Sequence, residues 1–180
     1  MVMGIVAIVI VLIILIVAGG IISVYNSVVK LNADAENAWA KVETVYQMRA
    51  DKIPNLVETV KGAKNFEQET LTRITEARSA WTNAKTTEEK VAAANGMESA
   101  LSRLMVVVEN YPDLKSNQNF LALQDEISAT ENKIAVERNR YNDAATALNV
   151  RLRTFPTNFI AGMFGFKEKS LFKSVAGAEN

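Results

Sequence analysis

Apolar residues fill the first part of the chain, and charged residues appear only after it. Residues 1–29 contain no Asp, Glu, Lys or Arg, and residues 5–18 are apolar throughout. A helix needs about 20 predominantly apolar residues to cross a bilayer. The pattern therefore predicts a transmembrane anchor over residues 1–24, with the lipid bilayer as its first partner.

A secretory signal peptide is the alternative interpretation of this segment. Ala18, Gly19 and Gly20 would supply the small residues of a cleavage site. A signal peptide, however, begins with basic residues and has an apolar core of about 7–15 residues. Here no basic residue precedes the apolar run, and Ile21 and Ile22 continue it past the glycines. The pattern favours an anchor that is not cleaved.

Beyond the anchor, the apolar positions repeat with helical period, and no stretch alternates with a period of two. The first apolar stripe begins inside the anchor and continues past it with alternating spacings of four and three. Its members are Val24, Val28, Leu31, Ala35, Ala38, Val42 and Val45. We therefore expect the anchor and the first bundle helix to form one continuous helix.

Three prolines, at positions 54, 112 and 156, divide the rest of the chain. Proline lacks an N–H and disfavours helix in the residue before it, so each is an expected helix boundary. Two interpretations are open at Pro54, which either begins a second helix or only kinks one long helix. In the second case the end of the chain would lie far from the membrane.

Capping residues predict where the next helices begin. Asp51 is expected to cap a helix whose apolar stripe runs from Ile53 to Trp81. Residues 86–89, Thr-Thr-Glu-Glu, match a capping box for a third helix that ends near Asn110. Ser116 is expected to cap a fourth helix that reaches about residue 154.

The fourth helix has the most regular repeat, with apolar residues at seven-residue intervals. These are Phe120, Ile127, Ile134, Tyr141, Leu148 and Phe155. Such a repeat is typical of shallow-angle, coiled-coil-like packing. The predicted fold is all-α, with the N-terminal transmembrane helix continuing into an up-and-down antiparallel four-helix bundle over residues 25–155. This topology would bring the chain after Phe155 back to the bilayer.

A Phe-rich C-terminal tail, residues 156–180, follows the bundle. Phe159, Phe164, Phe166 and Phe172 are the candidate membrane-contacting residues, since aromatic side chains are common in interfacial elements. The alternative is that these aromatic residues close the open end of the bundle. Two glycines interrupt the segment and favour this alternative.

Composition excludes several kinds of chemistry. The chain has no His and no Cys, which excludes disulfides, His-dependent nucleophiles and zinc sites built on Cys or His. No glycine-rich phosphate-binding motif occurs, and the adjacent carboxylates Glu88-Glu89 and Asp125-Glu126 diverge around a helix. We expect no metal and no cofactor. With 20 basic and 20 acidic residues interleaved, nothing indicates nucleic acid as a partner.

Several sequence blocks together resemble the LemA family of bacterial membrane proteins. They are RADKIPNLVETVKG at 49–62, ENYPDLK at 109–115, NFLALQ at 119–124, Phe155-Pro156 and Gly165-Phe166, and the resemblance covers nearly the whole chain. Two positions depart from it, because Ala63 and Phe66 stand where the family usually has an aromatic residue and a His. A role that needs an imidazole there cannot operate in this chain.

The resemblance implies a four-helix domain on a single-pass anchor in the cell (inner) membrane. It also implies a short N-terminus outside and a cytoplasmic bundle. Lys30 and Lys41 flank the anchor on its C-terminal side and favour the same orientation by the positive-inside rule. The resemblance implies no known reaction and no catalytic residues.

Five residues are candidates for an interaction surface. Asn55, Glu58 and Lys61 fall at helical spacing on one face, although they equally fit a solvated helical turn with i,i+3 pairs. Trp39 and Trp81 are contact candidates if they are exposed.

The predicted function is a non-enzymatic, membrane-anchored helical scaffold at the bacterial membrane. It would self-associate as a homo-oligomer, organise other membrane proteins, or both. The alternatives are an accessory subunit that positions a membrane enzyme or protease complex, and a hydrolase that uses carboxylates alone.

Overall fold

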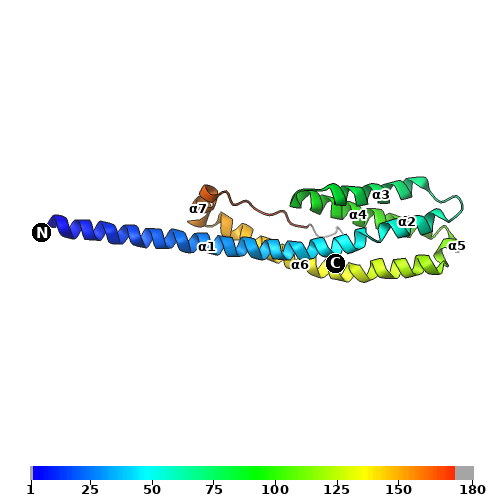
Figure 1. Cartoon of the computed structure of the whole chain (residues 1–180), viewed down its shortest axis with the longest axis horizontal. Helices are drawn as coiled ribbons and strands as arrows, with labels where there is room; N and C mark the ends of the chain where they lie inside the picture. Colours follow the sequence, from blue (N-terminus) through cyan, green and yellow to red (C-terminus); the bar gives the residue numbers. More distant parts are fainter. Residues whose placement is uncertain (1, 173–180) are drawn as a thin grey trace, which may run out of the picture. The chain divides into compact units, whose positions relative to one another are not determined.

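The computed structural model describes residues 2–172, and within this range the chain forms helices and no strand. In chain order (Figure 1) the helices are α1 (Val2–Ala50), α2 (Ile53–Lys61), α3 (Gln68–Asn83), α4 (Thr87–Val108), α5 (Pro112–Lys115), α6 (Gln118–Arg153) and α7 (Thr157–Phe164). The predicted all-α class is confirmed, and so is the continuous helix that includes the apolar N-terminal segment. The tail from residue 173 onward lies outside the described residues.

The chain divides into two compact units. Among the described residues, the anchor unit comprises residues 2–37 together with Asn142–Lys169, and the large unit comprises Ala38–Tyr141 with residues 170–172. Helices α1 and α6 contribute residues to both units. Each unit has its own buried side chains and is described separately below.

The anchor unit contains the apolar stretch of α1. Residues 3–22 are exposed, and α1 is long and apolar enough to cross a membrane. Helix α4 is also long and apolar enough to cross a membrane, but 44% of its most apolar stretch is buried inside the protein. Beyond residue 22, α1 buries side chains on one face, including Val28 and Ala35. The core of the unit consists of Val28, Ala35, Leu148, Leu152 and Ala161.

The large unit contains the last turns of α1, helices α2 to α5, and α6 up to Tyr141. Helices α3 and α4 pack side by side as a hairpin (Figure 1). The predicted seven-residue repeat of α6 is buried from Phe120 to Tyr141 in this unit, and its next member, Leu148, is buried in the anchor unit. Its expected last member, Phe155, is 86% exposed, and that part of the prediction is wrong. The reason is that α6 ends at Arg153, so Phe155 does not continue the helical register.

The expected helix over residues 53–81 is wrong, because two shorter helices cover this range. The residue at the N-cap of α2 is Lys52, which makes no side-chain cap, and Pro54 lies in the first turn. Asp51, the expected cap, instead accepts a hydrogen bond from Gln47 Nε2 at 2.7 Å. The chain turns back after α2, at residues 62–67, and α3 packs against α2 (Figure 1).

A side chain from α3 compensates for the missing N–H of Pro54. In an uninterrupted helix, the amide at position 54 would donate to the carbonyl of Ala50, which is a buried residue. Arg78 Nε donates to Ala50 O instead, at 3.1 Å. A buried carbonyl without a partner costs about 1–3 kcal/mol, so this contact stabilises the break between α1 and α2.

The expected caps differ in their outcomes. The capping box at Thr86 and Glu89 is confirmed, with both reciprocal hydrogen bonds present at the start of α4. Ser116 does not cap α6, because its hydroxyl donates to the carbonyls of Pro112 and Asp113. The carboxamide oxygen of Asn117 accepts from the amides of Asn119 and Phe120 and is the actual cap.

The capping box predicts a pH dependence of stability. Hydrogen bonds from the backbone amides of Lys85 (2.7 Å) and Thr86 (3.2 Å) lower the pKa of Glu89 below its ordinary value. The stabilisation is therefore present above that ordinary pKa, and it is lost as the pH falls through the folded-state pKa. Urea unfolding of Glu89→Gln should lack this part of the acid destabilisation. An identical acid profile in the variant and the parent would contradict the prediction.

Candidate functional site

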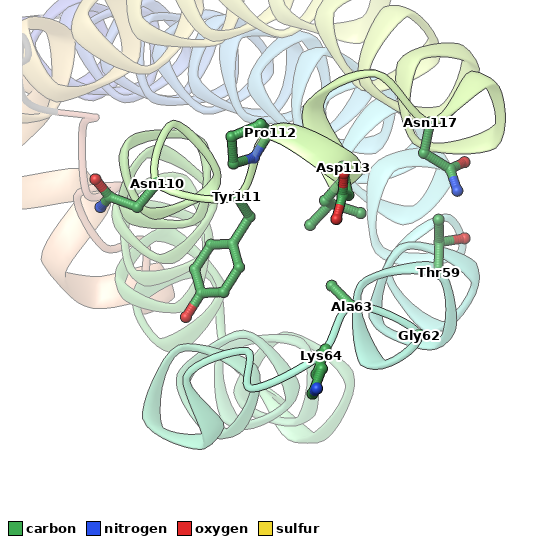
Figure 2. A pocket seen from close by; sticks show the side chains of 10 residues that line it. Thr59, Gly62, Ala63, Lys64, Asn110, Tyr111, Pro112, Asp113 and Asn117 are labelled. Carbon is green, nitrogen blue, oxygen red and sulfur yellow. The ribbon is translucent and has the colours of Figure 1, made fainter.

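A cavity of about 390 Å³ lies where two loop regions of the large unit meet. One wall comes from the end of α2 and the loop that follows it, and the other comes from the connection between α4 and α6 (Figure 2). The lining residues are Thr59, Gly62, Ala63, Lys64, Asn110, Tyr111, Pro112, Asp113, Leu114 and Asn117.

Contacts between the two loop regions hold this cavity in shape. The Tyr111 hydroxyl donates to the carbonyl of Asn65 at 2.9 Å, and the Tyr111 ring packs on Phe66 with centroids 4.8 Å apart. Asn65 has a φ of 61°, a left-handed conformation that Asn tolerates better than most residues. The Phe66 ring thus packs against the second wall, which Tyr111 belongs to.

The lining groups are suited to hydrogen bonding with a polar ligand. Lys64 and Asp113 place both signs of charge at the cavity, and Asn110 and Asn117 add carboxamides (Figure 2). All four side chains are exposed. Among residues 2–172, no three His, Cys, Asp or Glu side chains are grouped so that they could hold a metal ion. The arrangement offers hydrogen-bond donors, hydrogen-bond acceptors and both signs of charge.

The predicted surface residues of α2 lie on the helix that leads into this cavity. Asn55, Glu58 and Lys61 are all exposed, and Lys61 Nζ lies 2.8 Å from Glu58 Oε1. The Asn55 carbonyl accepts a hydrogen bond from the hydroxyl of Thr59, which lines the cavity. Sequence reasoning found this face of α2 but missed the cavity beside it.

The two tryptophans lie in or near the core of the large unit. Trp81 is fully buried, so its side chain is not available at the surface. Trp39 is half-buried, with its ring 5.1 Å from that of Tyr141 and stacked on Phe172 at 6.0 Å. Both rings pack against other aromatic residues of this chain.

The four candidate residues of the tail have different surroundings. Phe159 and Phe164 are exposed in the anchor unit, and Phe166 is half-buried with its ring 5.9 Å from Tyr25. Phe172 is only 4% exposed and belongs to the large unit, so it is not available to lipid in this structure. There it stacks on Tyr46, with ring centroids 6.2 Å apart.

Two polar clusters connect helices inside the large unit. Glu98 accepts a hydrogen bond from the Tyr46 hydroxyl and forms an ion pair with Arg138 at 3.0 Å. Burial and the neighbouring Glu98 carboxylate raise the pKa of Tyr46 well above its ordinary value. Burial likewise raises the pKa of Tyr141 to about 12. These groups join α1, α4 and α6, and no periodicity in the sequence indicates which of them pair.

The second cluster is centred on Arg49, one of the most deeply buried side chains. Its Nε donates to Thr130 Oγ1 at 3.0 Å, and a terminal nitrogen lies 2.6 Å from Glu131 Oε2. Glu131 is largely exposed, so water screens this ion pair. Arg49 is the first residue of the block 49–62, and the structure shows that this part of the block packs inside the unit.

Comparison with known proteins identifies the family. The LemA family model matches residues 38–180, which is most of the chain. This protein belongs to the LemA family. Protein LemA of Metamycoplasma hominis is 29% identical over 150 residues, covering 83% of this chain and 68% of that protein. The exposed apolar part of α1 fits a membrane location for this LemA-family chain.

Magnetosome proteins are similar to part of the chain. Magnetosome protein MamQ 2 of Paramagnetospirillum magneticum is 36% identical over 81 residues, which cover 45% of this chain and 30% of that protein. Magnetosome protein MamQ of Magnetospirillum gryphiswaldense is 32% identical over 80 residues, which cover 44% of this chain and 29% of that MamQ protein.

Two of the LemA-like sequence blocks lie next to each other in the structure. The block 49–62 ends at Gly62, in the first wall of the cavity, and the block 109–115 supplies most of the second wall. Because the chain turns back after α2 and again after α4, residues 59–64 and 110–117, about 50 positions apart in the sequence, line the same cavity. The sequence signal for the cavity was thus present in the two blocks, but only the fold shows that they are adjacent.

Proposed function

We propose that this LemA-family protein is a membrane-anchored helical scaffold, with the exposed apolar part of α1 in the bilayer. The observation that carries the proposal is that residues 3–22 are apolar or small, uncharged and without any buried side chain. Exposing this much apolar surface to water is unfavourable, and a bilayer covers it. The first helix then continues without interruption to Ala50.

The scaffold role is supported by buried polar side chains that pair with one another between helices. Arg49, Glu98 and Arg138 form hydrogen bonds and ion pairs that join helices to one another. Buried polar networks that are fully satisfied make a fold rigid and specific. We propose that they fix the register of an up-and-down antiparallel four-helix bundle, whose members are α1 with α2, then α3, α4 and α6.

The proposed partner-binding surface is the cavity together with the exposed face of α2. It presents Lys64, Asp113 and the pair Glu58–Lys61, so it offers both signs of charge to an extended peptide of a partner or of another copy. Copies anchored in one bilayer have a high effective concentration, so weak contacts between them are sufficient for assembly. We propose a single-pass topology with a cytoplasmic bundle, following the positions of Lys30 and Lys41.

Single-cysteine crosslinking tests this proposal directly, because the chain contains no native Cys. The variants Lys64→Cys and Asn55→Cys would carry a photoreactive group in intact membranes, and Val136→Cys on the exposed side of α6 is the matched control. We expect adducts from the first two variants and none from the control. Adducts of twice the chain mass indicate self-association, and other masses indicate a different partner.

Two results would contradict the proposal. Recovery of the protein in the soluble fraction after carbonate extraction would exclude the anchor. Monomers alone from every variant, at all expression levels, would exclude a scaffold that acts through this surface. The same variants report topology, because a membrane-impermeant maleimide should not label Lys64→Cys in intact cells if the bundle is cytoplasmic.

A further inference from the structure

Helix α7 has apolar residues on two faces. On one face, Ile160 and Ala161 are buried, and Ala161 belongs to the core of the anchor unit together with Val28 and Leu152. The other face is not covered by the described residues. Its large side chains, with Phe155 just before the helix, are exposed as follows: Phe155 86%, Phe159 72%, Met163 71% and Phe164 52%.

A groove of about 290 Å³ runs between this helix and α1. Its lining is apolar and includes Ile21 of α1, then Phe155, Phe159, Ile160, Met163 and Phe164. A concentrated apolar patch of this kind on a protein surface marks a site where protein or lipid binds.

The groove is continuous with the apolar surface of the anchor. Ile21 lines the groove and is also one of the exposed residues of the stretch 3–22. Tyr25, one turn further along α1, contacts the C-terminal end of α7, with its ring 4.7 Å from Phe164 and 5.9 Å from Phe166. A Tyr next to apolar residues at the end of a membrane-spanning stretch is typical of the bilayer interface.

Basic residues follow both apolar segments in the sequence, Lys30 after the apolar stretch of α1 and Lys167 after α7. Lys30 lies about 14 Å beyond Ile21 along α1, at 1.5 Å per residue. Lys167 lies shortly after α7, and neither lysine forms an ion pair with a described residue, whereas Arg153 pairs with Glu168 and Lys169 with Glu36. Lysines placed in this way extend their apolar stems along a membrane surface and present their amines to lipid phosphates.

We infer that α7 is an interfacial helix and that the groove between α7 and α1 holds the acyl chain of a bilayer phospholipid. The outward face of α7 inserts beside the anchor, and the inward face joins this insertion to the folded anchor unit. The bilayer is the occupant because the groove opens from the surface that the anchor already presents to lipid. This inference rests on the proposed insertion of α1, and the experiment separates the two.

Nitroxide labels on single cysteines measure which residues face lipid. The full-length protein is reconstituted in vesicles of phosphatidylethanolamine and phosphatidylglycerol, with labels at Phe159→Cys, Met163→Cys, Ile10→Cys and Val136→Cys. Oxygen concentrates in the bilayer and a nickel chelate stays in water, so their relative effects on each label report its surroundings. We expect the labels at 159 and 163 to resemble the anchor label at 10 and to differ from the water-facing label at 136.

A phospholipid with a photoreactive diazirine in its acyl chain tests the groove itself. We expect crosslinks on α7 as well as on residues 3–22. The double variant Phe159→Ser with Met163→Ser should lose the α7 crosslinks and retain those on the anchor. Because both side chains are exposed, the variant should keep the parent's helical content by circular dichroism, which serves as the folding control.

Each alternative outcome has a definite meaning. A lipid-facing label at position 10 with water-facing labels at 159 and 163 would overturn the inference and leave the proposed anchor intact. A water-facing label at position 10 would overturn both. Disulfide-linked dimers through Met163→Cys, without lipid crosslinks on α7, would show that a second copy occupies the groove and would also overturn the inference.

Discussion

Replacing Trp81 with alanine is expected to lower the free energy of unfolding of the large unit by about 3–5 kcal/mol. The side chain is fully buried, and its ring packs on Tyr46 with centroids 5.1 Å apart. Lys90 Nζ lies 4.5 Å from the ring centroid, and the indole N–H donates to Gln47 at 3.2 Å. Alanine would remove all of these contacts and leave a cavity between α1, α3 and α4.

Trp81→Phe is the matched control for this prediction. Phenylalanine keeps an aromatic ring against Tyr46 and loses the indole N–H and part of the volume, so we expect a smaller loss than with alanine. Urea unfolding of the full-length protein in detergent micelles, followed by circular dichroism, measures both variants. A loss below about 1 kcal/mol for Trp81→Ala, the typical effect of an average substitution, would show that this residue does not belong to the core.

Replacing Glu98 with alanine is expected to have an effect of similar size, about 3–5 kcal/mol, for a different reason. Glu98 and Arg138 are both mostly buried, with 18% and 11% of their side chains exposed. Alanine would leave the buried hydroxyl of Tyr46 without its acceptor and remove the carboxylate that faces the Arg138 guanidinium. Losing one partner of a buried pair costs more than the pair itself contributes.

Two further variants separate charge from hydrogen bonding at this cluster. Glu98→Gln keeps an oxygen acceptor for Tyr46 and removes the negative charge, so its loss measures mainly the interaction with Arg138. Tyr46→Phe removes the hydroxyl and keeps the ring between Trp81 and Phe172. In a double-mutant cycle, the Tyr46 and Glu98 substitutions should be non-additive. Additive losses would show that the hydroxyl and the carboxylate do not interact in solution.

The region around Pro54 shows what a sequence pattern can and cannot predict. Proline correctly marked the end of α1, because its missing N–H is a local property. The pattern did not show that Arg78, from α3, would satisfy the carbonyl of Ala50, nor that the chain would turn back only at residues 62–67. Those outcomes depend on contacts between segments that lie apart in the sequence.

The aromatic residues of the tail show the same limit. Their composition indicated a region with an unusual environment, and both interpretations, lipid contact and packing, fitted the residue types equally well. The structure places Phe159 on an exposed face and Phe172 in the core of the large unit. Phe159 lies within α7, whereas Phe172 follows the end of that helix at Gly165, which has a φ of 75°.

The sequence by itself determined the uncharged apolar N-terminal segment, the all-helical class, the continuity of α1, the capping box at Thr86 and the LemA resemblance. All of these follow from local composition, periodicity or short motifs. Only the tertiary structure decided the pairing of Glu98 with Tyr46 and Arg138, the cavity between residues 59–64 and 110–117, and the groove beside α7. Periodicity specifies which face of a helix is apolar, and the chain reversals decide which segment covers that face and which apolar surface stays exposed.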